Sequence, residues 1–203
     1  MAKRISQIIS FVFHPLLLPT YSFILIFVVD PYLFGNYSKV QLGGMIISVF
    51  INTFLLPAVA ILLMYKLGFI KSLYMLEGRE RIIPFFGVII FYIWTFMAFR
   101  KSVYPEILNV CLLGACFAIL IAFLITLFKK VSLHTIGMGS LVGLMIILSF
   151  ISGTNLSWYL AGVILLAGIV GSARLNLEAH DNIEIYMGYI IGMTCQFLAL
   201  HYF

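Results

Sequence analysis

Charged side chains are scarce in this sequence, and their scarcity excludes most classes of soluble protein. Of the 203 residues, 9% are charged, whereas 64% are hydrophobic and the mean hydropathy is +1.16. A soluble domain usually devotes about 25% of its residues to charged side chains, because polar groups must cover its surface. The composition therefore predicts an integral, multi-pass membrane protein.

The sequence also lacks alternation of polar and apolar residues, and it has few cysteines. A membrane β-barrel needs short segments of alternating polarity, so the continuous apolar runs argue against one. Cys111, Cys116 and Cys195 all lie inside such runs and show no zinc-ligand spacing, so we assign them to packing. No other cluster has metal-ligand spacing. We expect no metal, no cofactor and no nucleic-acid partner.

Long apolar runs are what the sequence does contain. A helix needs roughly 20 apolar residues to cross about 30 Å of hydrocarbon. The runs predict an all-α, polytopic helical bundle that forms a single domain over residues 1–203, because the connections between the runs are short. The seven predicted spans are 8–29, 42–67, 83–99, 106–128, 135–152, 156–172 and 183–202.

Proline and glycine occur at positions that suggest how the helices pack. His14, Pro15 and Pro19 predict a kink in the first span, since proline removes a backbone donor. Gly139 and Gly143 are spaced as GxxxG in the fifth span and predict a close helix contact. We assign His14, and His201 near the last residue, to structural or interfacial roles.

The few polar clusters fall between spans in a way that predicts a common site. The segments that contain RERIIP (79–84), SLH (132–134) and ARLNLEAHDNIE (173–184) are each separated by an even number of crossings, so they reach the same membrane surface. Arginine matches phosphate oxygens with its planar fork, and histidine can transfer protons or attack phosphorus near neutral pH. Together these residue types predict a site for a phosphorylated substrate.

The last of these segments resembles a known family. In this segment five residues separate Arg174 from His180, three separate His180 from Glu184, and Gly188 and Gly192 follow. This pattern resembles the third motif of the type 2 phosphatidic acid phosphatase superfamily, which is SRxxxxxHxxxD before a glycine-bearing helix.

Two further segments resemble the remaining motifs of that superfamily. Ser132-Leu133-His134 is similar to the second motif, PSGH, and the segment from Lys71 to Pro84 is similar to the first, KxxxxxxRP. Either Arg79 or Arg81 would be the arginine of the first motif.

The resemblance implies a six-helix phosphatase core and a role for each motif residue. His180 would be the nucleophile, Glu184 would orient its ring, and His134 would donate a proton to the leaving group. Phosphate ligands are implied at these positions: Arg174, Ser132, Arg81, Arg79 and Lys71. Four residues span one helical turn, so Glu184 is expected beneath the His180 ring on a helix. No metal is needed for this chemistry.

The function implied is hydrolysis of a membrane lipid phosphate or diphosphate through a phosphohistidine, by a protein of the bacterial inner membrane. An isoprenoid diphosphate such as undecaprenyl diphosphate is the first choice of substrate, and a glycerolipid phosphate is the second. The sequence departs from the motifs at Val131, Leu133 and Ala173, which stand in place of proline, glycine and serine, and Glu184 replaces aspartate. The alternative is therefore a catalytically degenerate member that binds lipid phosphates or serves as a subunit of a membrane assembly.

Overall fold

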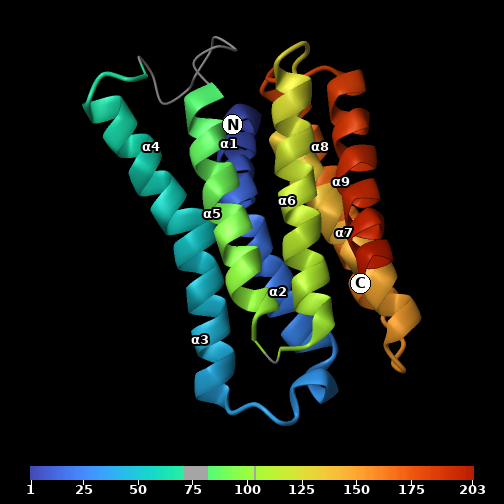
Figure 1. Ribbon diagram of the computed structural model, residues 1–203. Coiled ribbons are helices and arrows are strands. Elements are labelled where there is room, and N and C mark those ends of the chain that lie inside the picture. Colours follow the sequence, from blue (N-terminus) through green and yellow to red (C-terminus); the bar gives the residue numbers. More distant parts are fainter. Residues whose placement is uncertain (71–81, 103) are drawn as a thin grey trace.

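The chain folds into one bundle of long helices (Figure 1). The computed structural model describes residues 1–70, 82–102 and 104–203, and it contains no β-strand among them. The α-helices are α1 (Ala2–Val12), α2 (Leu18–Val29), α3 (Lys39–Phe50), α4 (Leu56–Lys66), α5 (Ile82–Arg100), α6 (Glu106–Thr126), α7 (Leu133–Ile151), α8 (Ser157–Asn176) and α9 (Asn182–Tyr202). Three short helical turns are η1 (Pro15–Leu17), η2 (Pro31–Phe34) and the π-helix η3 (Ile51–Leu55).

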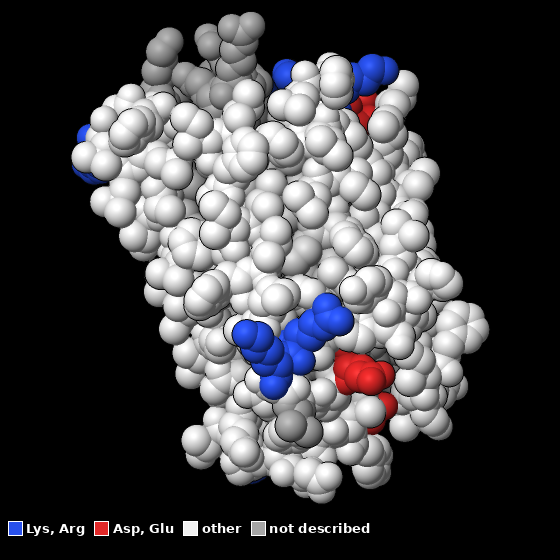
Figure 2. Space-filling view, viewed as in Figure 1, with Lys and Arg blue, Asp and Glu red and all other residues white. Residues whose placement is uncertain are grey.

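Seven helical stretches among the described residues are long and apolar enough to cross a membrane, in agreement with the predicted number of spans. The stretches are Ala2–Val29, Lys39–Lys66, Ile82–Arg100, Glu106–Thr126, Leu133–Ile151, Ser157–Asn176 and Asn182–Tyr202. Figure 2 shows that charged side chains gather toward the two ends of the visible face and leave an uncharged band between them. Length and charge distribution together fit a multi-pass membrane protein.

The first stretch breaks where the prolines predict a kink. Helix α1 ends at Val12, and the chain passes through His14 into η1 before α2 begins. The break is compensated locally, because the Tyr21 hydroxyl donates to the Val12 carbonyl at 2.9 Å. A kink of this kind is tolerated in a membrane span because another side chain satisfies the freed carbonyl.

The second stretch contains an irregularity that the sequence did not predict. The π-helix η3 lies between α3 and α4 and ends two residues before Pro57, which cannot supply the backbone N–H of a regular turn. Thr53 is fully buried in η3, and its hydroxyl lies 2.9 Å from the Val49 carbonyl and 3.4 Å from the Leu16 carbonyl. The irregular part of this stretch therefore contacts the irregular part of the first.

Helices α7 and α9 pack more closely than any other pair of described helices. Small residues make this possible: a Cβ added at Gly139 would collide with the Tyr189 backbone, and one at Gly192 would collide with the Ile136 backbone. The close contact predicted from Gly139 and Gly143 is confirmed, with α9 as the partner.

Three segments distant in sequence meet at one end of the bundle. The N-terminus of α1, the α6–α7 connection and the α8–α9 connection all lie at the same end (Figure 1). The predicted convergence of SLH and ARLNLEAHDNIE is therefore present in the structure.

Candidate active site

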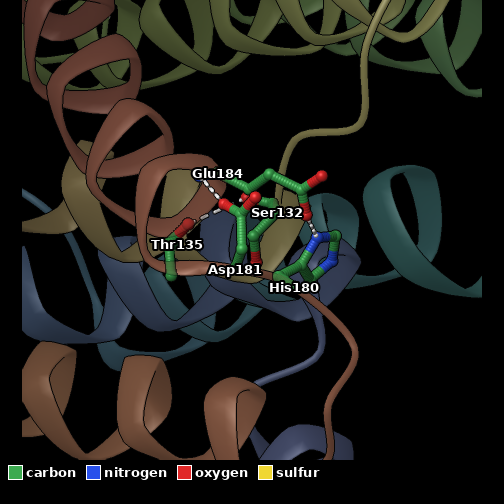
Figure 3. A network of polar contacts seen from close by, with 5 residues as sticks. All are labelled: Ser132, Thr135, His180, Asp181 and Glu184. Atoms are coloured by element: carbon green, nitrogen blue, oxygen red, sulfur yellow. Dashed lines mark hydrogen bonds and ion pairs between the residues drawn. The ribbon is translucent and has the colours of Figure 1, made fainter.

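The α8–α9 connection places His180 against Glu184. His180 Nδ1 lies 2.7 Å from Glu184 Oε2, and the two side chains are 11% and 20% exposed (Figure 3). A carboxylate only accepts hydrogen bonds, so Nδ1 carries the proton and the neutral ring has its lone pair on Nε2. This is the tautomer that a nucleophilic histidine requires.

The contact predicted from the four-residue spacing is present, but the backbone that carries it is not helical throughout, contrary to the prediction. His180 lies before α9 rather than within it, and Asp181 caps the helix by accepting the Glu184 backbone N–H at 2.8 Å. Glu184 lies in the first helical turn and reaches back to the ring. The capping contact stabilises the turn that holds both groups.

The two additional carboxylates of this segment have structural partners. Asp181 is occupied as the cap, and exposed Glu178 pairs with Lys3 at 3.2 Å. Neither contact involves Arg174 or His180. Both acids are therefore engaged in contacts of their own.

Arg174 lies in the last turn of α8 and reaches α1. Its Nη1 donates to the Ser10 hydroxyl at 3.2 Å. Its Nε is buried and has no hydrogen-bond partner among the described residues. A buried guanidinium donor without a partner is costly, and a phosphoryl oxygen is a ligand that would satisfy it.

Residues of the SLH segment lie at the start of α7, but they differ in what they face. His134 Nε2 lies 3.0 Å from the Ser10 carbonyl, so this nitrogen carries the proton and Nδ1 is the remaining nitrogen for substrate chemistry. Ser132 is fully buried, and its hydroxyl lacks a hydrogen-bond partner among the described residues. The Ser132 carbonyl accepts from the Thr135 hydroxyl at 3.1 Å (Figure 3).

A cavity of about 530 Å³ joins three of the predicted residues. His134, Arg174 and His180 line one part of it, whereas Ser132 does not line it. Most of the remaining lining is apolar and comes from η1, α2, α4, α5, α6 and α7. The lining of the cavity therefore suits an amphiphilic ligand, because it combines a guanidinium and imidazole groups with a hydrocarbon part.

The predicted first motif cannot be placed in this cavity. Lys71, Arg79 and Arg81 lie in 71–81, outside the described residues. Pro84, the last residue of that motif, lines the cavity. The structure thus brings the start of α5 to the site.

Two groups of residues at the site were missed by the sequence analysis. Ser6 and Ser10 are buried on α1, where Ser6 accepts from the Asn176 amide at 2.9 Å and Ser10 contacts both Arg174 and His134. Their four-residue spacing in an apolar helix is a polar stripe, and such a stripe is a signal for a buried polar face.

His14 is the second missed feature. It lines the cavity beside His134, with the two ring centroids 6.0 Å apart, although the sequence analysis assigned it a structural or interfacial role. A histidine next to proline at a predicted kink gave no indication of its neighbours.

The cysteines and the acidic residues provide no metal centre in the described part of the chain. Cys111, Cys116 and Cys195 are buried free thiols. No group of three or more His, Cys, Asp or Glu side chains there could hold a metal ion.

Comparisons with known proteins give no further assignment. No family model, no curated protein and no solved structure matches the chain.

Proposed function

We propose that this protein is a membrane-embedded lipid phosphatase of the type 2 phosphatidic acid phosphatase kind. The observation that carries the proposal is the oriented His180–Glu184 pair, whose histidine lines a largely apolar cavity together with Arg174 and His134. A soluble phosphate would not need the apolar part of this cavity. A lipid phosphate matches both parts.

The proposed reaction begins with attack on phosphorus by His180 Nε2. The P–N bond forms as the bond between phosphorus and the leaving oxygen breaks, and Glu184 stabilises the imidazolium that results. Arg174 holds phosphoryl oxygens, where negative charge is spread in the transition state.

Proton transfer is assigned to His134. When this ring is protonated, its Nδ1–H gives a proton to the leaving oxygen, while Nε2–H stays on the Ser10 carbonyl. Water then attacks the phosphohistidine, the P–N bond breaks, and His134 Nδ1 takes the proton from that water. Inorganic phosphate and the lipid product leave, and both histidines return to their first state.

The substrate class follows from the cavity together with the family resemblance. An isoprenoid diphosphate of the bacterial inner membrane remains the first choice, and a glycerolipid phosphate remains the second. Both substrates carry a phosphate that can meet Arg174 and His180 and a hydrocarbon part that can follow the apolar lining.

A second function is favoured by Ser132 and Leu133. Ser132 does not line the cavity, and Leu133 replaces the glycine that would free the backbone at this turn. The alternative is a protein that binds lipid phosphates without hydrolysing them, or that serves as a subunit of a membrane assembly.

The test is phosphate release by the purified full chain in detergent. Undecaprenyl diphosphate, farnesyl diphosphate and phosphatidic acid are compared as substrates for wild type, His180→Ala and the control His201→Ala. His201 lies exposed in the last turn of α9 and does not line the cavity. We expect His180→Ala to abolish release and His201→Ala to retain it.

Two results would contradict the phosphatase proposal. Full activity of His180→Ala would remove its nucleophile. Tight binding of these lipids by wild type with no release from any of them would support the binding protein instead.

A further inference from the structure

His14 occupies a fixed position at the break between α1 and η1. Its Nδ1 accepts the backbone N–H of Leu16 at 3.4 Å, so its side chain caps the short turn that follows. A nitrogen that accepts an N–H carries no proton. The His14 ring is therefore neutral, and its proton is on Nε2, on the opposite side of the ring from the η1 backbone.

Contacts along α1 show how far His14 lies from the membrane surface. Three side chains of α1 contact α8 or the turn after it in order of depth: Lys3 with Glu178, Ser6 with Asn176 and Ser10 with Arg174. His14 comes about one helical turn after Ser10. It is therefore the deepest of the polar residues that α1 and its end bring toward the site.

The neighbours of His14 mark a boundary inside the cavity. Its ring forms T-shaped contacts with His134, at 77° and 6.0 Å between centroids, and with Phe54, at 76° and 6.3 Å between centroids. The residues that follow it, Pro15 and Leu16, are apolar and also line the cavity. His14 therefore lies where the polar and hydrocarbon parts of the cavity meet.

We propose that His14 Nε2–H donates a hydrogen bond to the oxygen that links the phosphate of the substrate to its lipid chain. This inference rests on the proposed function. In a lipid phosphate, that oxygen is the atom between the charged group and the hydrocarbon, which is the boundary that His14 occupies. Negative charge develops on it as its bond to phosphorus breaks.

The role proposed for His14 is hydrogen-bond donation and not proton transfer. Because Nδ1 is held by the Leu16 N–H, His14 acts as a neutral donor that stabilises charge without losing its proton. His134 supplies the proton that the leaving oxygen finally takes. The two neighbouring histidines therefore divide stabilisation and proton transfer between them.

The experiment compares His14→Gln, His14→Leu and the matched control His201→Leu in the full chain. The glutamine amide can place an N–H donor near the position of Nε2, whereas leucine cannot. We expect His14→Leu to lower kcat for phosphate release by about 100-fold, the order of loss for one donor to a developing oxyanion. We expect His14→Gln to stay within about tenfold of wild type with an unchanged pH profile, because a lost proton-transfer group would alter that profile.

Two outcomes overturn the inference while the phosphatase proposal stands. One is wild-type kcat in His14→Leu. The other is a His14→Gln variant as inactive as His14→Leu. That result would mean that the His14 ring acts by titrating or by its structure alone, and not as a neutral hydrogen-bond donor. Thermal unfolding in detergent shows whether each variant is folded, and His14→Gln also loses the ring packing, so it controls for that loss.

A binding measurement separates failure of this inference from failure of the proposed function. Dodecyl phosphate is titrated into each protein by calorimetry. If wild type binds it but hydrolyses no lipid phosphate, the phosphatase proposal fails; weaker binding by His14→Leu with retained binding by His14→Gln then still supports the His14 contact. Where wild type hydrolyses no lipid phosphate, equal binding by wild type and both variants, or no binding by any, overturns the His14 contact.

Discussion

The α7–α9 pair and the α3–α4 stretch differ sharply in how they are held in the bundle. The most apolar windows of α7 and α9 are 61% and 33% buried, whereas the corresponding share in the stretch from Lys39 to Lys66 is 17%. The α7–α9 pair is joined through glycines at backbone contact distance. The α3–α4 stretch instead contains a π-helix and lies at one side of the bundle (Figure 1).

The two regions also contribute different groups to the cavity. The α7–α9 pair, with the turn before α9, places His134 and His180 in the cavity lining, and Glu184 contacts His180. The α3–α4 stretch contributes Phe54, Ala58 and Ile61, which are apolar lining residues. The proposed chemistry therefore rests on the tightly packed region, and the proposed contact with the lipid chain rests partly on the loosely packed one.

The largest expected effect on phosphate release comes from removing the carboxylate that orients His180. Glu184→Gln removes the negative charge beside His180 and frees the ring to adopt the other tautomer. We expect phosphate release to fall by about 10³-fold, on the scale of other histidine-orienting carboxylates. Steady-state phosphate release measures this change.

Glu178→Gln is the matched control for Glu184→Gln. Glu178 is exposed and pairs with Lys3, and exposed ion pairs contribute little. Equal losses in the two variants would show that a general charge effect, rather than the contact to His180, sets the activity.

The next effect tests the close packing itself. A Cβ at Gly192 would collide with the Ile136 backbone, so Gly192→Ala must separate α7 from α9. We expect destabilisation of about 3 kcal/mol, at the upper end for overpacking, and a lower thermal unfolding midpoint in detergent.

Gly168→Ala serves as its control on α8, where an added Cβ meets nothing within 4 Å. An unchanged midpoint is expected there. A Gly192→Ala protein as stable as Gly168→Ala would contradict the claim that this helix pair is the rigid part of the site.

The smallest effect tests the α3–α4 side of the comparison. Ile61 lines the cavity, whereas neighbouring Leu62 is 46% exposed on α4. We expect Ile61→Trp to narrow the hydrocarbon part and slow phosphate release from long-chain substrates by about tenfold, since changes in apolar fit are worth 10- to 200-fold. Release from short-chain octyl phosphate should stay near the wild-type rate.

Leu62→Trp provides the matched control, because the same bulk is added on an exposed position of the same helix. Equal inhibition of long- and short-chain substrates by Ile61→Trp would contradict a role for this stretch in contacting the chain.

Much of the fold could be predicted from the sequence, because span length and hydropathy are local properties. The seven stretches, the kink at His14-Pro15 and the close packing at Gly139 were all predicted and are present. The π-helix was not, because a bulge before Pro57 depends on how Thr53 packs against η1.

The candidate site was predicted in part for a similar reason. The spacing from His180 to Glu184 is local, so their contact followed from sequence, although the helix begins after His180. The contacts of Ser10 with Arg174 and His134 join residues more than 120 positions apart. Contacts with α7 and α8 determine which face of α1 points into the bundle. Hydropathy alone does not indicate that face.

The proposed mechanism requires that His180 carries the phosphoryl group during the reaction. The most direct measurement is mass spectrometry of wild-type protein after rapid quenching under alkaline conditions during turnover of farnesyl diphosphate. We predict a phosphoryl adduct on His180 that is absent from His180→Ala and forms at least as fast as phosphate is released. Turnover with no adduct on His180, or an adduct on another residue that persists in His180→Ala, would contradict it.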